Sequence, residues 1–224
     1  INLVSGFLVF VSMSGTIILM PFYLENVLGY PPHSVGLLLA VVPISLGIVA
    51  PISGALSDRL GTRPIAVAGL LILLGGFAAV STLSQETAAG GYRLRFLPIG
   101  IGIAVFQSPN NSAVMGAVPR ERLGVVSGLL SITRTLGQTT GIAVLGALWA
   151  SRVAHHAGGA LGAGATAASP AVQVTALSET FVAIMILVSV ALVLATWGLV
   201  QERRSRRLSK PVSPAFEEGP ARGL

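Results

Sequence analysis

Six long runs of apolar residues, separated by short charged connectors, organise the sequence. They cover residues 3–24, 35–53, 64–83, 94–118, 123–150 and 181–200. A helix needs about 20 mainly apolar residues to cross the hydrocarbon core of a bilayer. The runs are continuous, which excludes the short alternating segments of a membrane β-barrel. The pattern therefore predicts an all-α membrane protein, a six-transmembrane-helix bundle.

Prolines inside these runs are expected to bend the helices without ending them. In lipid the backbone must satisfy its own hydrogen bonds, and neighbouring helices tolerate such residues. We assign bends to Pro21, Pro43, Pro51 and Pro109.

Composition supports a membrane location and excludes other classes. Charged residues are 10% of the chain and hydrophobic residues 53%, whereas soluble domains carry roughly 25% charged residues. The net charge of +6 comes from residues between the apolar runs and in the tail. It does not form the basic stripe with interleaved aromatics that nucleic-acid binding uses, so no nucleic-acid partner is expected.

Basic connectors predict the orientation of the bundle, because short cytoplasmic loops are enriched in Lys and Arg. Most basic residues fall on one side of the predicted membrane. Both chain ends are therefore predicted to be cytoplasmic, in a bacterial plasma membrane. The residues on this side are Arg59, Arg63, Arg120, Arg122, Arg203, Arg204, Arg206, Arg207 and Lys210, against Arg93, Arg95 and Arg152 on the other.

Two segments lie outside the predicted spans. Residues 152–178 are small and low in complexity, which predicts a flexible external loop. Residues 201–224 begin with a basic cluster and continue through Pro, Ser and Glu, which predicts a disordered cytoplasmic tail. Because Ile1 lies at the edge of an apolar run with no charged flank, we expect the chain to be part of a longer protein.

No enzyme constellation is found in the sequence. The histidines, His33, His155 and His156, have no carboxylate or Cys at ligand spacing, so no metal site is expected. No phosphate-binding loop ending in Lys-Ser/Thr occurs. We therefore do not expect catalysis.

The most specific motif joins the second and third runs and reads GALSDRLGTRP from Gly54 to Pro64. It predicts a tight turn in which Gly54 and Gly61 allow close backbone approach and Asp58 caps a helix. The plain alternative is an ordinary basic loop.

This motif resembles the signature loop of the major facilitator superfamily. The stretches MPFYLENVLGYPPHSVGLLLAVVPISLGIVAPISG, VPRERLGVVSGLL and RTLGQTTG are similar to the C-terminal half of the fourteen-helix drug:proton antiporters of the EmrB/QacA type. The resemblance covers about residues 3–200.

The resemblance implies one half of a transporter whose two halves rock about a central cavity, so the partner is an N-terminal half. The first and fourth helices of each half would line the cavity, and the second and fifth would pack against the other half. It also implies coupling to a proton gradient, with no cofactor. The motif would act as a gating loop through Gly54, Asp58, Arg59, Gly61 and Arg63.

Polar residues inside the spans are the candidates for substrate contact, because they are costly in lipid and tend to face a wet cavity. The densest set is Gln107, Asn110 and Asn111 in the fourth run; the alternative role is hydrogen bonding between helices. Ser12 and Thr16 are weaker candidates, because hydroxyls can bond to their own helix backbone.

Arg134 is a basic residue inside the fifth run. At 1.5 Å per residue it lies about 18 Å beyond Arg122, near mid-membrane, where a charge requires a partner or a wet cavity. Gln138 lies one turn further on and forms an intramembrane polar network with it. A carboxylate from the other half is the favoured partner, because the acidic residues of this chain lie at the boundaries of the runs.

The leading hypothesis is the C-terminal half of a proton-coupled multidrug exporter, inactive in transport on its own. Its substrates would be hydrophobic small molecules, with cationic ones favoured. The alternatives are a major facilitator transporter of another substrate class, such as metabolite uptake, and a non-transporting membrane interaction module.

Overall fold

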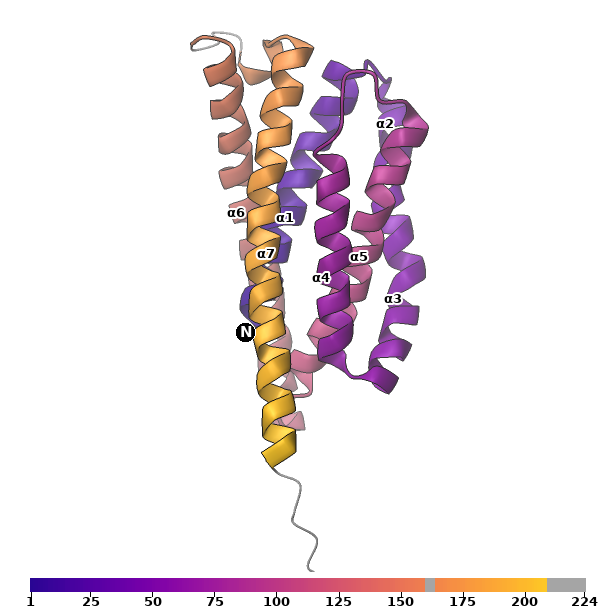
Figure 1. Cartoon of the computed structure of the whole chain (residues 1–224), viewed down its shortest axis with the longest axis vertical. Helices are drawn as coiled ribbons and strands as arrows, with labels where there is room; N and C mark the ends of the chain where they lie inside the picture. The colour runs from indigo at the N-terminus through magenta and orange to yellow at the C-terminus, as the bar shows by residue number, and fades with distance from the viewer. Residues whose placement is uncertain (160–163, 209–224) are drawn as a thin grey trace, which may run out of the picture.

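The computed structural model describes residues 1–159 and 164–208, and in these the chain forms long helices that stand side by side (Figure 1). The described residues contain no strand. Helix α1 continues into a π-helical turn, η1, and α2 and α3 form one rod. The helices are α1 (Asn2–Phe22), η1 (Tyr23–Val27), α2 (Pro32–Leu39), α3 (Val41–Leu60), α4 (Thr62–Val80), α5 (Ala89–Met115), α6 (Leu123–His156) and α7 (Pro170–Leu208), with 3-10 turns at Arg120–Arg122 and Ala165–Ala167.

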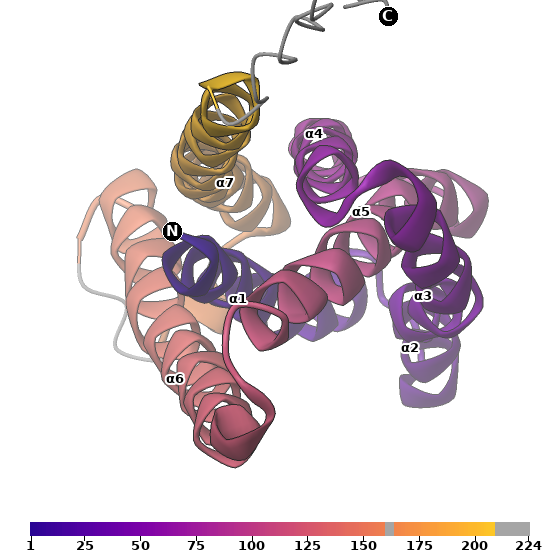
Figure 2. The same cartoon turned by 90° about the horizontal axis from the view of Figure 1, so that it is seen from below.

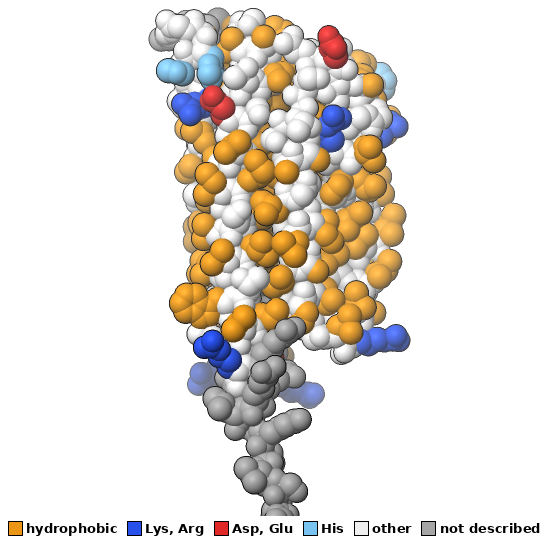
Figure 3. All heavy atoms as spheres, in the orientation of Figure 1, with side chains coloured by type: hydrophobic (Ala, Val, Ile, Leu, Met, Phe, Trp, Pro, Cys, Tyr) orange, Lys and Arg blue, Asp and Glu red, His pale blue; other side chains and the backbone are white. Residues whose placement is uncertain are grey.

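When α1 is joined with η1 and α2 with α3, the described residues form six long rods, the other four being α4, α5, α6 and α7. This confirms the predicted all-α, six-helix bundle. Four are long and apolar enough to cross a membrane by length and composition, namely Asn2–Val27, Pro32–Leu60, Thr62–Val80 and Pro170–Glu202. Helices α5 and α6 have 27 and 34 residues, which is ample length, but they are more polar. Hydrophobic side chains cover the middle of the bundle, and charged side chains gather at its two ends (Figure 3).

The expected external loop, 152–178, is mostly helical, and this prediction of its extent was wrong. Helix α6 continues to His156 and α7 begins at Pro170. Two contacts hold these helix ends together: Arg152 Nε and His156 Nε2 each lie 3.0 Å from a carboxylate oxygen of Glu179. The alanine-rich composition that suggested low complexity also favours helix. Residues 160–163 lie outside the described part.

Helix α7 also extends into the expected disordered tail, since it ends at Leu208. The Gln, Glu and Arg residues after position 200 are good helix formers, which accounts for the extra turns. Residues 209–224 lie outside the described part.

The second run is interrupted at Ala40, between α2 and α3. Pro43 has no N–H group to offer the carbonyl of Leu39, so the helical ladder loses a bond there. Pro21, Pro51 and Pro109 lie inside α1, α3 and α5, which continue past them as expected.

The helices pack as two groups, α1 with α6 and α7, and α5 with α3 and α4 (Figure 2). Helices α4 and α7 join the groups, where the rings of Phe77 and Phe181 lie 6.2 Å apart. Helices α4 and α5 approach closely because a glycine on α5 faces the α4 backbone: a Cβ on Gly102 would lie 2.6 Å from the backbone nitrogen of Leu73. On the opposite side, α5 makes few contacts with α1 and α6.

Candidate functional site

A hollow of about 440 Å³ lies between the α1–α6 pair and the α3–α5 pair, which make few contacts with each other. Its wall is mainly apolar, with methionine and phenylalanine side chains from α1 and α5. Apolar walls with a few polar groups are typical of small-molecule sites. The apolar lining is Phe10, Met13, Ile17, Met20, Leu39, Val42, Pro43, Leu46, Phe96 and Ile103.

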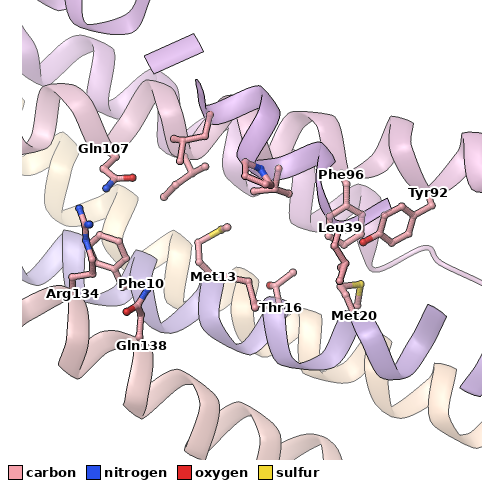
Figure 4. Close-up of a pocket in the computed structure, with 15 residues that line it drawn as sticks. Phe10, Met13, Thr16, Met20, Leu39, Tyr92, Phe96, Gln107, Arg134 and Gln138 are labelled. Carbon is pink, nitrogen blue, oxygen red and sulfur yellow. The ribbon is translucent and has the colours of Figure 1, made fainter. Parts of the chain in front are cut away.

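One end of the hollow is polar. Arg134 and Gln138 reach it from α6 and Gln107 from α5, so the structure brings these three predicted residues together (Figure 4). The guanidinium carbon of Arg134 lies 5.2 Å from the centre of the Phe10 ring, within the range of a cation–π interaction. None of the described lining residues is acidic.

Tyr92 marks the opposite end of the hollow and was missed in the sequence (Figure 4). The side chain is fully buried, and its ring stacks on Phe96 with centroids 4.2 Å apart. Its hydroxyl has no hydrogen-bond partner among the described residues. Tyrosines are common at the interface between membrane and water, near the ends of spans. The sequence therefore gave no indication that this tyrosine is buried at the hollow.

The polar set of α5 does not form one wall. Gln107 lines the hollow, whereas Asn110 is buried against α1, where its side-chain nitrogen would lie 3.4 Å from a Cβ on Gly6. Asn111 lines an adjacent groove of about 420 Å³, which residues of α3 and α5 form and which Gln107 also lines. The residues share one side of α5, but its neighbours divide that side between two spaces.

The hydroxyls of Ser12 and Thr16 bond to their own helix. Ser12 Oγ donates to the carbonyl of Leu8 and Thr16 Oγ1 to that of Ser12, each at 2.9 Å. Ser12 is fully buried and does not line the hollow, whereas Thr16 does.

The expected gating loop is shorter than predicted. Helix α3 continues through Asp58 to Leu60, and Gly61 alone makes the turn, with φ of 92°. A glycine is required there, because other residues rarely adopt this conformation. Asp58 is exposed and does not cap α4, which has no side-chain cap.

Arg59 is likewise exposed at the end of α3, while Arg63 connects α4 to α7. The Nε of Arg63 lies 3.1 Å from Glu202 Oε2, and the guanidinium of Arg63 also donates to the carbonyl of Gly198. Gly54 faces α5, where a Cβ would lie 3.3 Å from the side-chain oxygen Oγ of Ser108.

No group of three or more potential metal ligands occurs among the residues described. The hollow offers a cation, two amides and apolar surface, so it can hold a ligand but has no general base or nucleophile with which to transform it. Fold and site together define a helical membrane protein with an internal binding space.

Comparison with known proteins identifies the family. A family model described as Major Facilitator Superfamily matches residues 2–142, and the chain belongs to this superfamily. It is therefore a member of a transporter family and not of an enzyme family. A solved structure of the Escherichia coli fucose:proton symporter FucP has the same fold, with a TM-score of 0.68 and 17% identity over 87% of this chain and 47% of that one.

Curated relatives match a similar region. The chain is 36% identical over 126 residues to the uncharacterized transporter YebQ of Escherichia coli, covering 56% of this chain and 28% of that protein. It is 34% identical over 143 residues to the multidrug resistance protein Stp of Mycobacterium tuberculosis, covering 64% and 26%. For the riboflavin transporter RibZ of Clostridioides difficile the values are 28% over 138 residues, 62% and 30%. The matches thus span less than a third of each relative.

Proposed function

We propose that this chain is one six-helix half of a transporter that moves hydrophobic small molecules by alternating access. The observation that carries the proposal is the apolar hollow, which is lined by the first and fourth helices, α1 and α5, together with residues of α2, α3 and α6. This is the arrangement that the resemblance implies for half of a central cavity. The name of Stp supports export of drugs.

A second half is part of the proposal. Large apolar side chains along α3 and α6 are exposed, among them Ile48, Ile52, Val125 and Leu129. Gly36, Gly47, Gly124 and Gly128 have no atom within 4 Å of an added Cβ. Small residues allow helices to approach closely in membranes, so these faces suit another helical unit.

The remaining parts of the proposal follow the sequence. A proton gradient supplies the energy, no cofactor takes part, and the basic ends of α3 and α7 face the cytoplasm of a bacterial cell. The fourteen-helix antiporter type stays a prediction. The name of RibZ favours a second candidate, transport of a metabolite by the same fold.

Reconstitution tests the proposal. The product of the encoding gene and the isolated chain are placed in separate proteoliposomes with an imposed pH gradient, and movement of ethidium, of riboflavin and of 1-pyrenebutyrate is followed. We expect gradient-dependent movement of one of them by the gene product, and none by the isolated chain. Sustained transport by the isolated chain would contradict the assignment of one half.

A further inference from the structure

The charge chemistry of the hollow identifies a substrate class. We propose that the hollow binds amphipathic organic anions, with the acidic group at Arg134 and the apolar body along α1 and α5. This inference rests on the proposed function only in treating the hollow as a substrate site. It replaces the expectation of cationic substrates.

Arg134 supplies the charge. It is the charged member of the described lining, and the acidic residues that precede α7 lie outside it: Glu25 and Glu86 follow α1 and α4, Asp58 lies in the last turn of α3 and Glu121 precedes α6. A bound cation would therefore meet a like charge that no acidic residue of the described lining offsets. In a space of low dielectric such repulsion is much stronger than in water.

The guanidinium of Arg134 is free to bind. It makes no hydrogen bond or ion pair with another described residue, and its interaction with Phe10 is through the ring face. An arginine carries five N–H donors in a planar fork that matches a carboxylate or sulfonate. Gln107 and Gln138 at the same end add amide N–H groups that can donate to the same anion (Figure 4).

The rest of the wall suits an apolar body. From Phe10 to Met20 the lining of α1 extends for about 15 Å at 1.5 Å per residue. Met13 and Met20 lie along this stretch, Phe96 lies opposite on α5 (Figure 4), and Ile103 of α5 also belongs to the lining. Methionine side chains are flexible and polarizable, so they adapt to apolar ligands of different shape. An aromatic or alkyl body with one acidic end therefore complements the hollow.

Two matched probes test the proposal. The chain in nanodiscs of neutral lipid is titrated with 1-pyrenebutyrate, and binding is followed by fluorescence anisotropy after subtraction of empty nanodiscs. The competitor is a pyrenebutyl trimethylammonium cation, which has a similar body and the opposite charge. We expect saturable binding of the anion that excess cation does not displace.

Variants assign the binding to Arg134. Arg134→Gln should weaken anion binding about tenfold or more, because a charge-assisted pair is lost, and Arg134→Lys should weaken it less, because charge remains without the planar fork. Arg93→Gln is the matched control: it removes an exposed cation of α5 that does not line the hollow, and should leave binding unchanged. Helical circular dichroism confirms that each variant is folded.

Three results would overturn the proposal: equal binding of the cation, unchanged binding in Arg134→Gln, or no saturable binding by the folded chain. None of these results bears on the proteoliposome assay, so failure of the substrate class and failure of the transporter assignment are distinguishable.

Discussion

Gly141 of α6 lies directly against the backbone of Val11 in α1, so closely that a Cβ on Gly141 would stand 2.9 Å from the carbonyl carbon of Val11. Gly137, one turn earlier, lies against the side-chain Cβ of Phe10, and the ring of Phe10 contacts Arg134. This glycine pair therefore sets the distance between two of the helices that line the hollow.

Adding one methyl group at Gly141 should separate these helices. Gly141→Ala meets backbone, which cannot move aside as a side chain can, and we expect a loss of stability of about 1–3 kcal/mol. Gly128→Ala is the control, because it is on the same helix and has open space. Both variants gain the same helix propensity, so the difference between their unfolding free energies in detergent reports packing alone. Equal stabilities would contradict the close contact.

Removing Arg63 should release the end of α7 from α4. The pair with Glu202 is partly exposed, with side-chain exposures of 37% and 32%, so its contribution is about 1 kcal/mol or less. The hydrogen bond to Gly198 is lost as well. The chain has no cysteine, so spin labels at Leu60→Cys and Val200→Cys report this distance specifically. We expect a broader distance distribution in Arg63→Ala than in Arg63→Lys; identical distributions would exclude a restraining role.

Asp58→Asn should slow turnover of the intact transporter without lowering the stability of the fold. The carboxylate is exposed and has no cap hydrogen bond or ion pair among the described residues, so the melting temperature should change little. In the intact transporter we expect slower turnover with unchanged ligand affinity, because the residue lies at the α3–α4 turn and does not line the hollow. A loss of affinity with normal turnover would show that this role is wrong.

Tyr92→Phe tests whether the unpaired hydroxyl has a function. A buried polar group without a partner costs about 1–3 kcal/mol, so its removal should leave the chain equally stable or more stable in thermal unfolding. If ligands reach this end of the hollow, the same variant weakens binding of long amphipathic anions and leaves short ones unaffected. A marked loss of stability would reveal a partner for the hydroxyl.

The sequence was sufficient to predict the six-helix bundle. The prediction rested on the length of the apolar runs, which is also the physical requirement for crossing a bilayer. Helix ends were less predictable. At Asp58 and at Pro170 the chain is polar or small, yet α3 continues through Asp58 and α7 begins at Pro170. Apolar length marks the part of a helix that can cross a bilayer and carries no information on turns beyond it.

The site was predictable only in part. Arg134, Gln138 and Gln107 stood out because polar groups in a span are unusual, and they do meet at one end of the hollow. Asn111 lines only the groove beside α3 and not the hollow, and this depends on where α3 lies, which a pattern along one helix does not encode. Similarly, the burial of Tyr92 depends on packing between helices.

The polar character of α5 and α6 has a consequence for how the protein is made. Four rods are apolar enough to enter a bilayer by themselves, and these two are not among them. Insertion of isolated helices with amides and an arginine at mid-depth is unfavourable. We therefore expect α5 and α6 to stay at the translocation machinery until α4 packs on α5 and α1 packs on α6. The order in which the helices enter the bilayer would then depend on their neighbours in the bundle as well as on their order in the sequence.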